Sequence, residues 1–238
     1  MPRKARILIV EDEPAIRTGL NDVFIFHGYE TDVADDGNEG LKKALSGQFD
    51  LILLDVMLPA TNGFDICEAI RQQDKDQPII MLTAKSSDED IIQGLSLGAD
   101  DYVAKPFSVA QLVLRVQAVL RRSRLLESES TQITLGKTPT HSSIIDTRNL
   151  EGRCNGQPVS FTRREMETLQ YLHEHSNRPV SREELLNKVW GYAKTMNIET
   201  RTVDIHIARL RRKIESQPKH PRYLVTVRGG GYRLLSER

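Results

Sequence analysis

Cysteines and long apolar runs are scarce in this sequence, and each shortage argues against a class of protein. Cys67 and Cys154 are the only cysteines among 238 residues, and no CxxC or Cys/His cluster is present. A disulfide scaffold or a structural zinc site is therefore not expected. The scarcity of cysteine favours a cytoplasmic, reducing compartment. The longest apolar runs, such as Leu51–Leu54, fall far short of the roughly 20 residues that span a bilayer. The amino-terminal stretch MPRKARILIVED has no apolar core of the signal-peptide kind.

Net charge is also lacking, although the two halves of the chain differ strongly. Residues 1–122 hold 13 Lys and Arg against 20 Asp and Glu, whereas residues 123–238 hold 20 against 13. This split predicts two domains, of which the basic one faces a polyanion. Charge alone leaves open the alternative that two solvated surfaces merely differ in composition.

The acidic half alternates between strand-like and helix-like segments. Short apolar runs recur at Ile7–Val10, Thr31–Ala34, Leu51–Leu54, Ile79–Leu82 and Tyr102–Ala104. Several are almost continuous, which is typical of strands buried on both faces of a parallel sheet. Glycines end two of the intervening helices, and Ser108 is a suitable cap for the last one. The pattern predicts a flavodoxin-like (βα)5 domain of the α/β class.

Polar side chains stand where these predicted strands end. Glu11 and Asp12 follow the first strand, Asp55 the third, Thr83 the fourth and Lys105 the fifth. Ligands of such sheets lie beyond the carboxyl ends of the strands. Clustered carboxylates favour a hard cation such as Mg²⁺, and an aspartate can attack phosphorus to form an acyl phosphate. A single aspartate here is more often a turn residue, but five complementary groups favour phosphoryl transfer to Asp55, with Thr83 and Lys105 binding phosphoryl oxygens.

Four motifs in this half resemble the receiver domain of bacterial two-component response regulators. They are ILIVEDE (7–13), LILLDVMLP-x-x-x-G (51–63), MLTA (81–84) and GADDYVAKPF (98–107). The resemblance implies that a histidine kinase phosphorylates Asp55, with Mg²⁺ held by Glu11, Asp12, Asp55 and the Met57 carbonyl. It also implies a switch pair, Thr83 and Tyr102, and a cis Lys105-Pro106 bond. From turn chemistry, Gly63 is expected to adopt a positive φ.

The same resemblance implies a homodimer on phosphorylation. Two ion pairs between receivers are expected, Asp100 with Arg122 and Asp101 with Arg115. A third pair is replaced by Ile91 and Gln111, which cannot form an ion pair. The interface should therefore rely on apolar packing more than is usual.

A polar segment, residues 123–132, is predicted to link the receiver to a second domain at 133–238. Short extended pieces surround Asn155-Gly156, a strong hairpin signal, and predict a small antiparallel sheet. Thr162 with Glu165, and Ser181 with Glu184, have the spacing of capping boxes at the start of two helices.

A third helix is predicted at Thr200–Glu215, with an apolar stripe on one face. The stripe consists of Val203, Ile207, Leu210 and Ile214, and most other positions are basic. A basic helix can also be a membrane-surface, calmodulin-binding or solvated helix. The stripe has no Trp or Phe, which disfavours a membrane surface, and a glycine-rich hairpin follows. This order is that of a winged helix-turn-helix, an α+β fold.

The second half resembles the winged-helix output domain of the OmpR/PhoB family. The motifs are FTRREMETLQYL, SREELLNKVWG, RTVDIHIARLRRKI and LVTVRGGGYRL. The resemblance implies a recognition helix in the major groove of double-stranded DNA and a wing residue, Arg228, in the minor groove. It also implies that a loop at Trp190–Glu199 contacts RNA polymerase. The expected helix contacts are Arg201, His206, Arg209 and Arg212; Ala208 stands where a basic residue is often found.

Together these features predict a phosphorylation-regulated transcription regulator that binds tandem DNA half-sites as a dimer and is not an enzyme. An aspartyl-phosphate phosphatase is disfavoured because Met57 stands where a second aspartate is usually needed. A regulator that acts through protein contacts without phosphate remains the alternative.

Overall fold

The computed structural model describes residues 3–84, 97–123, 132–136, 143–192 and 201–236. The contacts within the chain divide it into two compact units, Met1–Arg124 and Leu125–Arg238. The expected linker, 123–132, falls almost wholly outside the described residues. Among the residues that are described, no helix is both long and apolar enough to cross a membrane.

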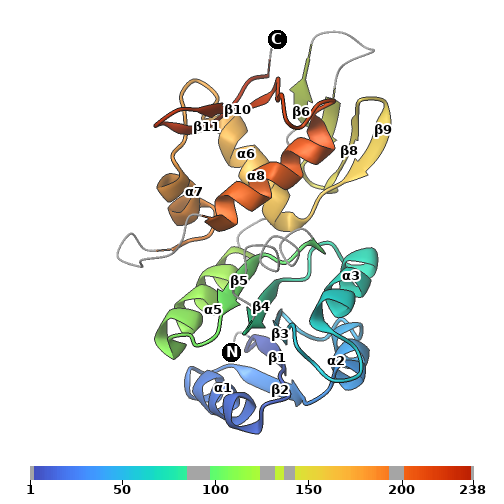
Figure 1. Cartoon of the computed structure of the whole chain (residues 1–238), viewed down its shortest axis with the longest axis vertical. Coiled ribbons are helices and arrows are strands. Elements are labelled where there is room, and N and C mark those ends of the chain that lie inside the picture. The colour runs from blue at the N-terminus through green and yellow to red at the C-terminus, as the bar shows by residue number, and fades with distance from the viewer. Residues whose placement is uncertain (1–2, 85–96, 124–131, 137–142, 193–200, 237–238) are drawn as a thin grey trace. The chain divides into compact units, whose positions relative to one another are not determined.

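Unit 1 is built on five parallel strands in the order β2-β1-β3-β4-β5 (Figure 1). The strands are β1 (Arg6–Val10), β2 (Glu30–Ala34), β3 (Leu51–Asp55), β4 (Ile79–Thr83) and β5 (Asp101–Ala104). Every residue of β3 and β4 is buried, which explains why both strands are almost continuously apolar. The strand order confirms the predicted flavodoxin-like fold.

Helices cover both faces of this sheet (Figure 1). The helices α1 (Pro14–Phe26) and α5 (Val109–Ser123) pack on one face, around a core that includes Phe24 and Leu112. The helices α2 (Gly37–Ala44) and α3 (Gly63–Gln73) lie on the other face. The helix expected between β4 and β5 falls at residues 85–96, outside the described ranges.

Gly63 is required for a reason other than the expected one. It is the first residue of α3 and not a residue of positive φ; in this loop the positive φ, +69°, belongs to Ala60. A Cβ atom on Gly63 would lie 2.1 Å from the carbonyl oxygen of Asp55. The close approach of α3 to the end of β3, and not turn conformation, therefore excludes a side chain here.

Unit 2 begins with an antiparallel sheet in the order β6-β7-β8-β9. These strands are β6 (Gln132–Leu135), β7 (Ser143–Asp146), β8 (Glu151–Cys154) and β9 (Gln157–Ser160). Asn155 and Gly156 join β8 to β9 with φ values of +50° and +80°. Two positive φ values in a two-residue turn match the twist of the flanking strands, so the predicted hairpin is confirmed.

The remainder of unit 2 has the predicted winged-helix order. It consists of α6 (Arg163–Glu174), α7 (Arg182–Lys188), α8 (Arg201–Ile214) and a hairpin of β10 (Leu224–Val227) with β11 (Gly231–Leu234). All four residues of the apolar stripe on α8 are at most 1% exposed.

Of the two predicted capping boxes, one is complete and one is half formed. Thr162 and Glu165 exchange both hydrogen bonds at the start of α6. At the start of α7 the Ser181 hydroxyl accepts from the Glu184 amide, but the Glu184 carboxylate does not return the bond. It accepts instead from Arg178 and Tyr171, at 2.6 and 2.8 Å. The hydrogen bond from Arg178 is the main reason why the pKa of Glu184 is lowered to about 2.

Replacing glycine by alanine should have opposite effects in α1 and α3. Gly63→Ala forces a methyl group onto the Asp55 carbonyl, and such overpacking costs about 1–3 kcal/mol. Gly19→Ala, in an exposed helical position with nothing near its Cβ, should stabilise α1 by roughly 0.5–1 kcal/mol. Urea denaturation of both variants measures the difference. A neutral Gly63→Ala variant would contradict the close approach.

Candidate phosphorylation site and nucleic-acid interface

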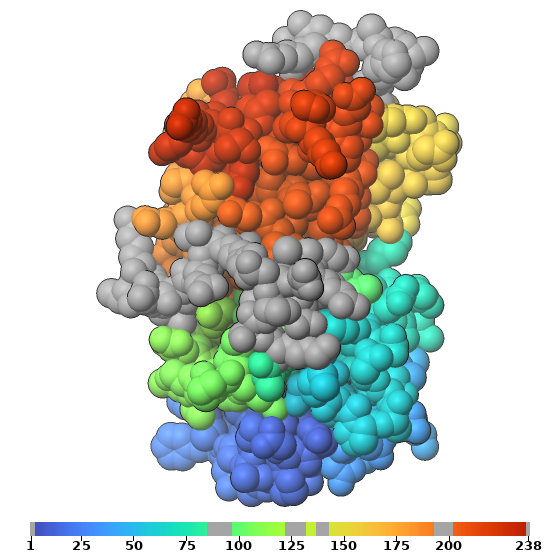
Figure 2. All heavy atoms as spheres, in the orientation of Figure 1, coloured from blue at the N-terminus to red at the C-terminus, as the bar shows by residue number. Residues whose placement is uncertain are grey.

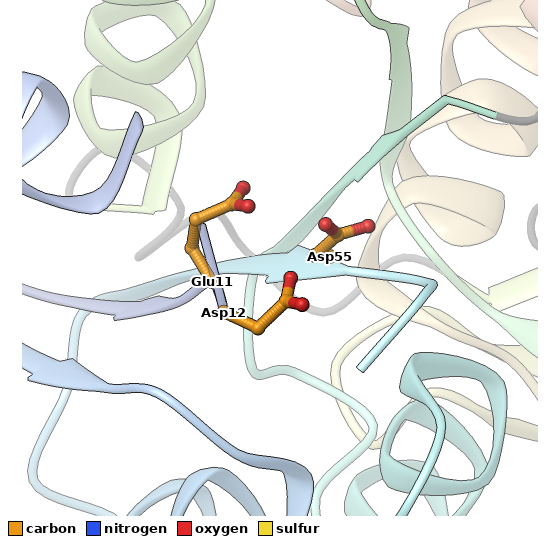
Figure 3. Close-up of side chains that lie close together, drawn as sticks. All are labelled: Glu11, Asp12 and Asp55. Atoms are coloured by element: carbon orange, nitrogen blue, oxygen red, sulfur yellow. The ribbon is translucent and has the colours of Figure 1, made fainter. Parts of the chain in front are cut away.

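Three carboxylates converge at one edge of the sheet in unit 1. Asp55 is the last residue of β3, and Glu11 and Asp12 follow β1, its neighbour in the sheet. One oxygen from each side chain lies within 4.8 Å of the others (Figure 3). Glu11 and Asp55 are 0% and 2% exposed. The parallel order of the strands thus brings together residues more than 40 positions apart in the sequence.

Lys105 connects two of these carboxylates. Its Nζ atom donates to Glu11 Oε1 at 2.8 Å and to Asp55 Oδ2 at 2.7 Å. Burial by itself lowers the pKa of Lys105, but the hydrogen bonds to Asp55 and Glu11 outweigh it, so the pKa is raised. Lys105 therefore remains charged and offsets part of the negative charge.

Lys105 does not fully compensate Glu11. Burial raises the pKa of Glu11 to about 7; the hydrogen bond from Lys105 opposes this shift and the Asp55 charge adds to it. Glu11 Oε2 is buried with no hydrogen-bond partner among the described residues. A buried oxygen without a partner, beside two further carboxylates, fits the oxygen ligands that Mg²⁺ requires.

The other predicted residues of this site lie on neighbouring strands or in the loop after β3. Thr83 is the last residue of β4 and Tyr102 is in β5; both are buried. The Met57 amide donates to Asp55 Oδ1 at 3.0 Å. The Lys105-Pro106 bond is cis, as the resemblance implied.

Sequence reasoning missed Arg17. One of its terminal guanidinium nitrogens donates to the carbonyl oxygens of Glu11 and Asp12, at 2.8 and 2.9 Å. The available signal was its place in the first turns of α1, from which a long side chain reaches back to the preceding loop.

The two carboxylates expected to form ion pairs between receivers have partners within their own chain in this structure. Asp100 pairs with Arg71 of the same chain at 3.0 Å and also accepts from the Ile79 amide. Asp101 is fully buried and pairs with Arg115 of the same chain at 2.5 Å. Both carboxylates are therefore buried inside unit 1, and their pairing across a dimer stays a prediction. Gln111 is exposed on α5, whereas Ile91 and the Arg122 side chain lie outside the description.

Two of the expected DNA contacts on α8 also point inward. His206 is fully buried and packs edge-on against the Trp190 ring, with centroids 5.1 Å apart. Arg209 is 7% exposed and pairs with the buried Glu165 at 2.9 Å. Both residues belong to the interior of unit 2, so the expectation that they are exposed on α8 is wrong, whereas their contact with DNA stays a prediction.

The accessible part of α8 has fewer basic residues than predicted. Arg212 and Ala208 are exposed there, and Arg228 is exposed in the turn between β10 and β11. Arg211 ties the two elements together by donating to the Leu224 carbonyl at 2.8 Å. The helix and the hairpin are both visible on one face of unit 2 (Figure 2). The Arg201 side chain and residues 193–200, most of the predicted polymerase loop, lie outside the description.

A polar cluster fixes the hairpin to the helices. Tyr232 of β11 donates its hydroxyl to Asp204 of α8 at 2.6 Å, and Arg182 of α7 contacts both residues. Tyr232 also forms a bridge with Val180, where Gly231 approaches so closely that a Cβ would lie 2.1 Å from the Val180 carbonyl oxygen. The wing is thus held in a defined position beside α8.

Both halves of the chain match known families. Residues 7–117 match the response regulator receiver domain, and residues 156–234 match the carboxyl-terminal domain of transcriptional regulatory proteins. A probable transcriptional regulator, ycf27 of Guillardia theta, is 40% identical over 229 residues, which are 96% of this chain and 90% of the relative.

Two solved structures are similar to this chain over 98% of its length. A cysteine-to-serine mutant of RitR is 30% identical with a TM-score of 0.71, covering 98% of this chain and 99% of its own. The response regulator DrrB of Thermotoga maritima, described as an OmpR/PhoB homolog, is 30% identical with a TM-score of 0.51 over the same shares.

The chain therefore belongs to the two-component response regulators. Within them it is of the OmpR/PhoB type, in which a receiver domain precedes a winged-helix DNA-binding domain. These proteins are transcription regulators and not enzymes. A receiver implies a histidine kinase as partner, and the output domain implies DNA.

Arg209→Ala and Arg212→Ala should affect different properties although both remove a charge from α8. Arg209→Ala leaves the buried Glu165 without one of its cations, and removing one partner of a buried ion pair costs roughly 3–5 kcal/mol of stability. Arg212 is exposed, so Arg212→Ala should weaken DNA binding without destabilising the fold. Thermal unfolding and DNA titration at fixed salt separate the two effects. A fully stable Arg209→Ala variant with impaired DNA binding would restore Arg209 as a contact.

Proposed function

We propose that phosphorylation of Asp55 by a histidine kinase switches this regulator to tight DNA binding. The observation that carries the proposal is the position of Asp55 at the buried end of β3, beside two acidic residues and 2.7 Å from Lys105. The domain limits that accompany it are a receiver at 1–122, a linker at 123–132 and an output domain at 133–238.

The chemistry proposed for Asp55 is nucleophilic attack on phosphorus. A carboxylate oxygen of Asp55 forms the new P–O bond, and the P–N bond to the donor histidine breaks. Glu11, Asp12, Asp55 and the Met57 carbonyl would hold Mg²⁺, which supplies positive charge to the phosphoryl oxygens. Lys105, already hydrogen-bonded to Asp55, would bind one of those oxygens as a compact cation.

The proposed switch follows from the new charge. A phosphoryl group adds charge and acceptor oxygens to the carboxyl end of β3. The Thr83 hydroxyl would donate to one oxygen, and Tyr102, on the adjacent strand, would repack behind it. Lys105 now bridges Glu11 and Asp55, so phosphorylation changes its partners as well. The result is a shift between two populations of the receiver.

The activated receiver is proposed to dimerise through its β5–α5 side. Val109 and Leu114 of α5 are 41% and 47% exposed, which provides apolar surface there. Two tethered output domains then bind half-sites about 10–10.5 base pairs apart. Arg201 and Arg212 would contact the major groove, Arg228 the minor groove, and the loop at 190–199 RNA polymerase.

Asp55→Asn tests the switch. The amide keeps the shape of the side chain but removes the nucleophile, so the variant should take up no phosphate from a small-molecule phosphodonor in the presence of Mg²⁺. Its affinity for DNA with two half-sites should stay at the unphosphorylated level. Radiolabelling and DNA titration provide the measurements, and Asp22→Asn, an exposed position on α1, is the matched control.

Two results would count against the proposal. Stoichiometric labelling of Asp55→Asn would place the phosphoryl group elsewhere. Normal labelling of the natural chain with no gain in DNA affinity would favour the regulator that acts without phosphate.

Leu114→Lys tests the dimer surface. A lysine at this half-exposed position on α5 should weaken dimerisation of the phosphorylated chain, because a charge would be buried in an apolar contact without a partner. Phe26→Lys is the matched control, since Phe26 is an apolar residue 86% exposed at the end of α1, a helix outside the proposed interface. Sedimentation velocity of both phosphorylated variants compares them. Equal weakening by both, or by neither, would remove α5 from the interface.

A further inference from the structure

Arg17 forms hydrogen bonds to the backbone of the loop that carries two of the clustered carboxylates. From α1, one of its guanidinium nitrogens donates to the carbonyl oxygens of Glu11 and Asp12 at 2.8 and 2.9 Å. The Arg17 side chain is 18% exposed, and its nearest acidic partner, Asp35, is 3.9 Å away and 63% exposed. The two hydrogen bonds to carbonyl oxygens are therefore its main interactions, and the ion pair with Asp35 is weak.

These two carbonyl groups belong to the residues whose side chains form part of the acidic cluster, so binding them affects the geometry of the cluster. Glu11 and Asp12 lie between the last residue of β1 and the start of α1, at Pro14. The Glu11 amide is held by the Ala34 carbonyl at 3.0 Å, but the two carbonyl groups lie beyond the strand. Binding both carbonyl oxygens fixes two successive peptide planes, and with them the directions in which the Glu11 and Asp12 side chains leave the backbone.

Simple electrostatics makes an arginine here unexpected. A guanidinium next to a cation site repels the cation, so its charge alone lowers the affinity of the three carboxylates for Mg²⁺. The contribution that opposes this cost is geometric. Groups that bind and orient metal ligands typically change metal affinity by 10–100-fold when they are removed.

We propose that Arg17 is a positioning residue for the cation site, which holds the carboxylates of Glu11 and Asp12 toward Asp55 through their backbone. The inference rests on the proposed function, because it assigns Arg17 a role toward the Mg²⁺ that phosphorylation of Asp55 would use. Arg17 does not contact the cation or the phosphoryl group; it acts through the loop.

Two substitutions separate geometry from charge. Arg17→Gln removes the charge and at least one of the two hydrogen bonds, whereas Arg17→Lys keeps the charge but loses the planar guanidinium. If position dominates, Arg17→Gln should bind Mg²⁺ about tenfold more weakly than the natural chain, and Arg17→Lys should lie between them. If charge dominates, Arg17→Gln should bind Mg²⁺ more tightly and Arg17→Lys should be unchanged. Arg3→Gln, which removes an exposed arginine of the same unit that pairs with Asp50, is the matched control and should leave the affinity unaltered.

The measurement is calorimetric titration of the full chain with Mg²⁺, without a phosphodonor, together with thermal unfolding in the absence of metal. The rate of labelling by a small-molecule phosphodonor over a range of Mg²⁺ concentrations is the second readout, and it avoids any contact of α1 with a kinase. A weaker Mg²⁺ affinity, with the labelling rate restored at high Mg²⁺, supports the positioning role.

Other outcomes overturn the inference. Lower thermal stability of Arg17→Gln with unchanged Mg²⁺ affinity would reduce Arg17 to a structural residue, and tighter binding would show that its charge dominates. These failures are distinct from failure of the proposed function. If the natural chain bound no Mg²⁺ and took up no phosphate, the phosphorylation site itself would be wrong.

Discussion

The repulsion among three carboxylates at the ends of β1 and β3 is the constraint on which unit 1 depends. Like charges this close are unfavourable unless cations offset them. Lys105 supplies one positive charge inside the cluster, and Arg17 donates hydrogen bonds to the backbone of the loop after β1. Burial still raises the pKa of Glu11 to about 7, so the compensation is incomplete. The fold thus maintains a site that gains from a further cation, which is what a cation-dependent phosphoacceptor requires.

Packing around the same site restricts movements of the backbone that would let the three carboxylates separate. The carbonyl of Asp55 lies where a side chain on Gly63 would be, and the Met57 amide holds Asp55 Oδ1. Both contacts oppose a shift of the loop after β3 that would move the carboxylates apart. Rigid placement of charged groups suits the proposed switch, because a phosphoryl group on Asp55 would then change the partners of Lys105 and Thr83 and not merely shift the loop.

Local patterns predicted most of the fold, and interactions between distant residues account for what was missed. The strand-end residues Glu11, Asp55 and Lys105 were predictable because a parallel sheet brings strand ends together. Arg209 and Asp100 were not, because their partners are 44 and 29 positions away, at Glu165 and Arg71. A stripe on α8 identifies one buried face, but α8 packs against both α6 and α7. Basic residues next to the stripe are therefore drawn into ion pairs inside the unit.

In unit 2, two carboxylates, the buried Glu165 and the partly exposed Asp204, fix α8 to α6 and to the wing. Glu165 of α6 binds Arg209 and Lys213, which are one turn apart on α8. Asp204 joins α8 to the wing through Tyr232. Basic residues used in this way are lost as contacts, so the direct DNA surface on α8 is small, and Ala208 makes it smaller still. A small surface on one copy would give low affinity, whereas two tethered copies, as proposed, would gain through their high effective concentration. If the receiver dimerises as proposed, the few exposed basic residues among the described side chains of α8 favour control of DNA binding by dimerisation over control by rearrangement of the winged helix.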